Sequence, residues 1–111
     1  MTKYLAGLST GTPFEVLETR TVVVTAEGLD ISSGYEGATI IYTATVKDDL
    51  AASLPVTFVA DLKLNGTELI ADQILDAGVY DQGTGLLTLS FVVPAAVGNF
   101  DVKLSWDEQI I

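Results

Sequence analysis

The amino-acid sequence predicts an all-β protein, an antiparallel β-sandwich of about seven short strands. Apolar and polar residues alternate through successive runs, which is the pattern of strands with one face in a core. Glycine, proline, asparagine and aspartate separate these runs at roughly the 8–12-residue spacing of such folds. The two most helix-like stretches, residues 48–53 and 69–75, are short and lack a sustained helical period. A chain of 111 residues has the length of one domain, which we place at residues 19–111.

Residues 1–18 precede the regular strands and form a predicted N-terminal arm. Gly7, Gly11 and Pro13 interrupt regular alternation there. A group of apolar side chains makes this segment too apolar to be left in water: Tyr4, Leu5, Leu8, Phe14, Val16 and Leu17. One interpretation is a loosely ordered terminus. The other is an arm that binds a neighbouring subunit through these residues, and this is the hypothesis that we carry forward.

The regular strands begin after the arm. Residues 19–27 are rich in β-branched side chains, which favour strands, and the run ends at Gly28. The next predicted strand covers residues 36–47 and places one set of side chains on a single face: Ala38, Ile40, Tyr42, Ala44 and Val46. This face is expected to lie in the core.

Residues 55–64 alternate again, with an inward face made of Val56, Phe58, Ala60, Leu62 and Leu64. The dipeptide Asn65-Gly66 follows at once and predicts a type I′ hairpin, because both central residues of that turn need a positive φ. The returning strand is expected over residues 67–71. Residues 72–80 are expected to form a weaker strand or a bend.

The last third of the chain, residues 86–106, predicts a second hairpin with a turn at Pro94 and Gly98. Its inward face is expected to consist of Leu87, Leu89, Phe91 and Val93 in the first strand, and Phe100, Val102, Leu104 and Trp106 in the second. Trp106 is expected to close one end of the core. The outward face is polar, which argues against a binding site there.

The charge and the residue types that are missing exclude several functions. Five basic and 15 acidic residues give a net charge of −10, and the chain has neither His nor Cys. Such a chain repels phosphates, so we expect neither nucleic acid nor a membrane as partner. The charge serves solubility and the protection of sheet edges, or it suits a basic partner. With no G-x-S-x-G turn and no phosphate loop, the sequence predicts no enzyme and no cofactor.

Three binding alternatives stay open at this point. A calcium site is one, with oxygens from loop carboxylates, although carboxylates in turns explain the same residues: Asp48, Asp49, Asp72, Asp76 and Asp81. A sugar-binding platform is the second, with Tyr35, Tyr42 and Tyr80 as its aromatic residues. Asn65 also begins an N-glycosylation sequon, which is a candidate modification site if the protein is exported.

Four segments carry a family resemblance: residues 37–49, residues 55–58 with 64–67, and residues 91–104. Their pattern of strands and turns resembles immunoglobulin-like modules of bacterial and archaeal surface proteins, especially the cell-adhesion-related type. The resemblance covers roughly residues 20–106 and implies an immunoglobulin-like antiparallel β-sandwich. Such modules also recur as decoration, tail and fibre modules of phage and virus particles.

These observations together predict a non-enzymatic structural protein of an extracellular assembly. The most concrete form is a virion protein, a capsid decoration, cementing or tail protein that docks through its N-terminal arm and a sheet edge. Its expected partners are capsid proteins or neighbouring subunits, in a homo-oligomer or on a lattice. Residues 1–7 do not look like a secretory leader, which favours this form over an adhesin. The alternatives are a cell-surface adhesion or filament module and a small carbohydrate- or calcium-binding module.

Overall fold

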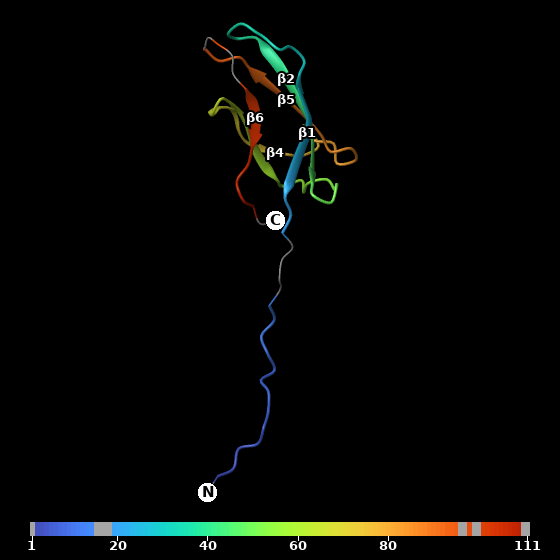
Figure 1. Ribbon diagram of the computed structural model, residues 1–111, viewed down its shortest axis with the longest axis vertical. Helices are drawn as coiled ribbons and strands as arrows, with labels where there is room; N and C mark the ends of the chain where they lie inside the picture. The colour runs from blue at the N-terminus through green and yellow to red at the C-terminus, as the bar shows by residue number, and fades with distance from the viewer. Residues whose placement is uncertain (1, 15–18, 96–97, 99–100, 110–111) are drawn as a thin grey trace.

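The computed structural model of the protein describes residues 2–14, 19–95, 98 and 101–109. This part of the chain holds strands and turns and no helix, as predicted (Figure 1). About seven strands were expected, and six lie in the described residues: β1 Val22–Leu29, β2 Thr39–Asp48, β3 Val59–Leu64, β4 Thr67–Ile74, β5 Leu86–Val92 and β6 Val102–Ser105. They form two antiparallel three-stranded sheets, ordered β1-β2-β5 and β4-β3-β6.

The predicted C-terminal hairpin is wrong in its pairing. β5 pairs with β2, with Leu87 opposite Ala44, whereas β6 pairs with β3, with Leu104 opposite Leu62. The two strands therefore belong to different sheets, and the chain passes from one sheet to the other between β5 and β6. Alternation fixes which side chains face the core, but both sheets face the same core, so alternation does not choose the partner strand.

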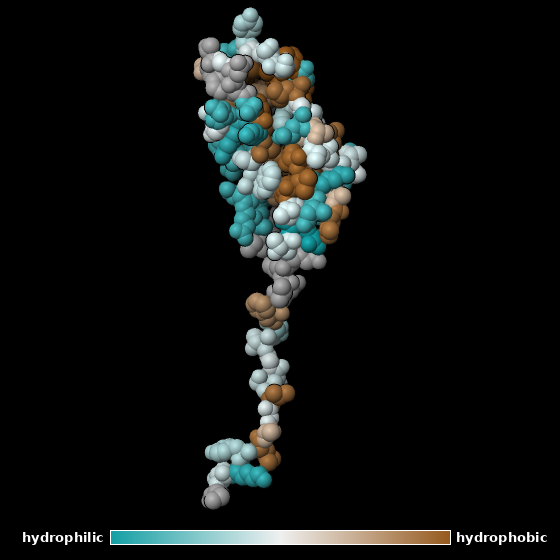
Figure 2. All heavy atoms as spheres, in the orientation of Figure 1, coloured by the Kyte–Doolittle hydropathy of each residue, from teal (hydrophilic) through white to brown (hydrophobic). Residues whose placement is uncertain are grey.

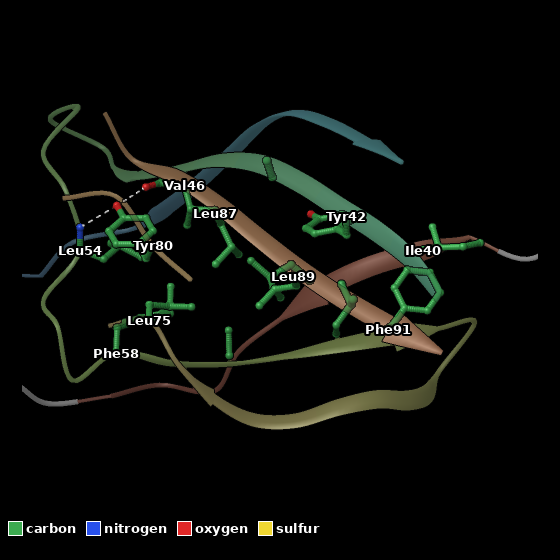
Figure 3. Close-up of a cluster of buried hydrophobic side chains, with 14 residues drawn as sticks. Ile40, Tyr42, Val46, Leu54, Phe58, Leu75, Tyr80, Leu87, Leu89 and Phe91 are labelled. Carbon is green, nitrogen blue, oxygen red and sulfur yellow. Dashed lines mark hydrogen bonds between the residues drawn. The ribbon is translucent and has the colours of Figure 1, made fainter. Parts of the chain in front are cut away.

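The core lies between the two sheets and draws side chains from both (Figure 3). The inward faces predicted for β2 and β5 are confirmed by full or nearly full burial of Ile40, Tyr42, Ala44, Val46, Leu87, Leu89 and Phe91. From the other sheet come Ala60, Leu62 and Leu104. Each large apolar side chain that is removed from water contributes roughly 1.5–3 kcal/mol to folding.

Two details of the middle of the chain differ from the prediction. Val56 is exposed instead of inward, because residues 55–58 form a turn in which the Phe58 amide donates to the Pro55 carbonyl oxygen at 3.0 Å. The segment expected as a weaker strand divides into the end of β4 and a bend. Within that bend, Tyr80 makes a single antiparallel bridge to Leu87.

The predicted Asn65-Gly66 hairpin is present between β3 and β4. Asn65 has φ 47° and Gly66 has φ 88°, the two positive values that a type I′ turn requires. The Asn65 amide also donates to the carbonyl oxygen of Asp101 at 2.9 Å, so the turn is joined to the residue that precedes β6.

Tyr80 joins separate parts of the fold at one end of the core. Its hydroxyl donates to the carbonyl oxygen of Val46 and accepts a hydrogen bond from the Leu54 amide at 3.1 Å (Figure 3). The side-chain amide of Gln82 then donates to the Leu54 carbonyl oxygen at 2.8 Å. Trp106, which was expected to close an end of the core, packs against it and stays partly exposed.

Residues 2–14 extend away from the two sheets as a long arm without secondary structure (Figure 1). The radius of gyration is 22.0 Å and the longest extent is 89 Å. A compact chain of this length has a radius of gyration near 13 Å. The arm accounts for the difference, since the two sheets occupy only the upper part of the molecule in Figure 1.

Candidate functional site

The two sheets present four edges at which a further strand can pair, and three of them are obstructed. β1 contains a bulge between Thr25 and Gly28, where Ala26 has φ 53°. β4 has register irregularities against β3, and its Asp72 has φ 51°. Bulges distort the ladder and twist an edge away from a flat partner. The edges of β1 and β4 are therefore poor templates for an added strand.

The first half of the outer edge of β5 is covered by the chain itself. The Thr88 amide donates to the Val79 carbonyl oxygen, and the Asp81 amide donates to the Leu86 carbonyl oxygen, both at 2.9 Å. Residues 79–81 thus take up the backbone groups on the first half of this edge.

The outer edge of β6 is open. β6 pairs with β3 in one continuous register from Asp61 opposite Ser105 to Leu64 opposite Val102. Because Asn65 bonds to Asp101, the alternation of an antiparallel ladder turns the backbone groups of Asp101, Lys103 and Ser105 toward β3. The N–H and C=O groups of Val102 and Leu104 point the other way. No backbone partner meets them in the part of the chain that the structure describes.

The residues after β6 stay beside β3 and leave this edge uncovered. The side-chain amide of Gln109 pairs with the backbone of Val59: it accepts from the Val59 amide at 2.8 Å and donates to the Val59 carbonyl oxygen at 2.7 Å. The described chain therefore runs on along the line of β6 and does not turn back along its outer side.

The side of the molecule between β1 and β6 is also the less complete side of the core. β4 and β5 approach each other within 8 Å between Cα atoms, whereas β1 and β6 have no Cα pair within that distance. Val22 and Val24 of β1 and Val102 and Trp106 at β6 pack against the core but stay partly exposed. Leu104, at 9%, is the most exposed member of the core itself. An added strand beside β6 would cover apolar surface here.

The apolar residues of the arm have no such cover. Tyr4, Leu5, Leu8 and Phe14 are between 84% and 102% exposed, and Figure 2 shows apolar side chains along the arm as well as on the visible face of the domain. Val16 and Leu17, the other two residues predicted to bind a partner, lie outside the described residues. The structure thus presents an exposed apolar arm and an uncovered strand edge in the same molecule.

The carboxylates considered for calcium are not brought together. Three of them accept hydrogen bonds from nearby backbone amides: Asp48 from Leu50 and Ala52, Asp76 from Gly78, and Asp81 from Gly83, at 2.8–3.0 Å. Asp49 lies 3.9 Å from the Arg20 guanidinium. Within the described ranges, no group of His, Cys, Asp and Glu side chains is arranged to hold a metal ion.

Two shallow hollows lie on the sheets. One, of about 190 Å³, is lined by Val59, Asp61, Asp72, Asp107 and neighbouring residues, and the Asp72 amide donates to the Asp61 carboxylate at 2.7 Å. The other, of about 340 Å³, is lined by residues of β1, β2 and the following turn, including Lys47 and Asp49. The lining of the first hollow also includes Trp106 and Gln109, so apolar and polar side chains meet there, but its volume lies below the roughly 300–1,000 Å³ of most small-molecule sites. The second hollow is lined mainly by polar side chains.

Of the three tyrosines considered for a sugar-binding platform, Tyr42 and Tyr80 are buried and Tyr35 is exposed, so the three do not form such a platform. The Tyr42 hydroxyl donates a 2.6 Å hydrogen bond to the Glu27 carboxylate. Burial, the bond to Glu27 and the charge of Glu27 all raise the pKa of the Tyr42 hydroxyl. The sequence did not predict this pair, because the bulge at Ala26 changes which residues of β1 share a face. Asn65, the candidate glycosylation site, is exposed in its turn.

Comparison with known proteins does not assign a family to the chain: no family model, no curated protein and no solved structure matches it. A search of the described residues finds no helix that is long and apolar enough to cross a membrane.

Proposed function

We propose that the described residues form an immunoglobulin-like fold in which none of the described strands occupies the position of the last strand. In that fold strands A, B and E share one sheet, and strands C and F lie side by side in the other. The orders β1-β2-β5 and β3-β6 support this correspondence, with the fourth strand beside β3 instead of β5. The seventh strand, G, pairs with the outer side of F. The corresponding edge here is the open edge of β6.

We propose that the protein is a non-enzymatic structural subunit of an extracellular assembly, and that the assembly is a virion. The observation that carries the proposal is the exposed apolar arm together with the open edge of β6. Main-chain hydrogen bonds to an open edge supply affinity, and alternate side chains supply register. The resemblance to decoration and tail modules makes a virus particle the assembly that we favour.

The energetics of the arm suit a lattice better than an isolated pair. Burying Tyr4, Leu5 and Leu8 contributes roughly 5–9 kcal/mol. Ordering an extended segment costs about 1–2 kcal/mol per residue, so for the segment from Tyr4 to Leu8 the cost is about as large as that gain. One arm contact is therefore weak. Many contacts in one particle raise the overall avidity without new interactions at any single joint.

The test is the location of the chain in its source and its dependence on the arm. A C-terminally tagged chain is produced in the source, released particles are sedimented through a density gradient, and the tagged chain is quantified in each fraction. The chain is expected in the particle fraction. Deletion of residues 1–17 is expected to lower its amount there at least tenfold, because the deletion removes all six candidate binding residues.

The control for folding is the melting temperature of the deleted chain, which is expected to match that of the full chain because no described arm residue is buried. Equal amounts of full and deleted chain in the particles would overturn the role of the arm. Recovery of the chain in the cell envelope would instead support the alternative, a cell-surface adhesion or filament module. The hairpin tip at Asn65 would then be open to glycosylation.

A further inference from the structure

We propose that residues 3–9 of one copy add an antiparallel strand to the outer edge of β6 in a second copy. The added strand would extend the second sheet to β4-β3-β6-arm and cover the incomplete side of the core. This inference rests on the proposed function. The partner of the arm is a second copy of the same protein, and the arm binds to the outer edge of β6 in that copy.

The choice of edge follows from the four edges described above. β1 and β4 carry bulges, and residues 79–81 cover part of β5. β5 and β6 each keep a continuous register with the inner neighbour, and on β6 the outward backbone groups of both Val102 and Leu104 have no described partner. These groups can bond to the backbone of an incoming extended segment.

The arm has the side-chain pattern that this edge requires. In an extended strand Tyr4, Ala6 and Leu8 share one face, and Lys3, Gly7 and Ser9 share the other with Leu5. On β6 the outward-pointing backbone groups belong to Val102 and Leu104, whose side chains face the core side. Residues that bond directly across an antiparallel ladder have side chains on the same face. Tyr4, Ala6 and Leu8 therefore pair with these residues and turn toward the core.

The direction of the chain favours a second copy over the arm's own domain. In Figure 1 the arm joins β1 at the end of the domain where β6 also finishes. An arm that folded back along its own β6 would run parallel to it, whereas all other pairs in both sheets are antiparallel. Antiparallel pairing is slightly more stable per residue. Residues 10–21 span up to roughly 40 Å when extended, which allows the arm to reach a neighbour.

The pairing predicts which side chains meet outside the core. Because Lys103 bonds inward to β3, it forms a non-hydrogen-bonded pair with the arm, in which Cα atoms lie about 4.5 Å apart. Its side chain is exposed. The arm residue opposite Lys103 is odd-numbered, Leu5 or Gly7 according to the register. A disulfide between these positions satisfies the usual Cα separation of roughly 4.4–6.8 Å.

The experiment uses disulfide trapping between two differently sized full-length copies, since the natural chain has no cysteine. One copy carries Leu5→Cys or Gly7→Cys, and the other carries Lys103→Cys and a size tag. The copies are mixed at rising concentration under mild oxidation. A mixed disulfide-linked dimer is expected for one of the two arm positions, with a yield at least tenfold above the controls.

Two matched controls isolate the geometry. Ala6→Cys places the thiol on the opposite face of the arm. Lys63→Cys makes the same substitution on β3, at the residue that pairs with Lys103. This position lies about two strand spacings from the arm. Both are expected to give background yields, because a separation beyond about 7 Å cannot be bridged.

The possible failures are distinguishable. Yields with Lys63→Cys or Ala6→Cys that equal the yield of the expected pair would overturn the inference. The absence of mixed dimers from sedimented particles that contain both copies would also overturn it. Neither result would affect the proposal that the arm carries the chain into the particles. A cross-link formed within one copy that carries both cysteines, without mixed dimers, would overturn the second copy as partner. Absence of the chain from particles would overturn the proposed function itself.

Discussion

The hydroxyl of Tyr42, on β2, donates a 2.6 Å hydrogen bond to the carboxylate of Glu27, on β1. Tyr42 is almost wholly buried in the core, while Glu27 lies beside the bulge of β1 and remains accessible. The pair holds a phenol in its protonated form next to a negative charge, so it links the stability of the fold to pH.

We expect the free energy of unfolding to fall above about pH 10. The pKa of Tyr42 is raised in the folded protein above its ordinary value of 10.0. Above that pH the unfolded chain therefore loses the proton and the folded chain keeps it. The stability from this group is present below pH 10 and declines by up to about 1.4 kcal/mol per pH unit as pH rises further. Urea unfolding between about pH 8 and pH 12 measures the slope.

The control is Tyr42→Phe, which cannot titrate. It is expected to lose about 1 kcal/mol at neutral pH, where the hydrogen bond is intact, and to show a flatter decline above pH 10. The same slope in both proteins would contradict the role of Tyr42.

We expect Tyr80→Phe to destabilise the fold by roughly 2–4 kcal/mol. The substitution leaves the Leu54 amide and the Val46 carbonyl oxygen without their common partner at a buried position, and each such group costs about 1–3 kcal/mol. Tyr35→Phe is the matched control, because Tyr35 is exposed, and it is expected to change stability by less than about 0.5 kcal/mol. Chemical denaturation of the three proteins measures the difference, and similar values for both variants would refute this prediction.

Two glycines with positive φ predict different penalties for the same change. Gly66→Ala, at φ 88°, meets no atom within 4 Å, so it is expected to cost only the backbone strain of about 1–2 kcal/mol. Gly85, at φ 76°, is buried, and an added Cβ would lie 3.1 Å from the Val46 carbonyl oxygen and 2.8 Å from Lys47 carbons. Gly85→Ala is therefore expected to cost more. Equal melting temperatures for the two variants would argue against the close approach at Gly85.

We expect association between copies to strengthen with salt. Each copy carries a net charge of −10, so two copies repel each other at long range. Raising the salt concentration from about 20 to 200 mM shortens the screening length to less than about 10 Å and reduces this repulsion. Sedimentation equilibrium at several salt concentrations measures the effect. Weaker association at high salt would indicate that ion pairs, rather than backbone and apolar contacts, hold the copies together.

The sequence predicted which side chains face the core better than it predicted which strands pair with each other. The alternation around Tyr42 and Leu89 correctly identified the side chains that face the core, because a buried face requires a period of two. The Asn65-Gly66 turn was predictable because few residues adopt positive φ without strain. The pairing of β5 and β6 was not predictable, since their apolar faces suit either sheet of the same core.

The candidate site was only half visible in the sequence. Exposed apolar residues such as Tyr4 and Leu8 drew attention to the arm. The open edge of β6 depends on which strands lack a neighbour, and that follows from long-range topology. The Glu27–Tyr42 pair depends on a bulge at Ala26, a non-glycine residue with positive φ that no local pattern announces.

Each molecule has one strand edge that can bind an arm, the uncovered edge of β6, and one arm that can bind such an edge. Under the proposed pairing a row of copies is directional: one end presents a vacant edge and the other a free arm. Such heterologous contacts close into rings or continue as open chains. A copy without residues 1–17 could still receive an arm but could not offer one. It would stop growth at one end only, so the ratio of shortened to full-length chains would set the length of the row.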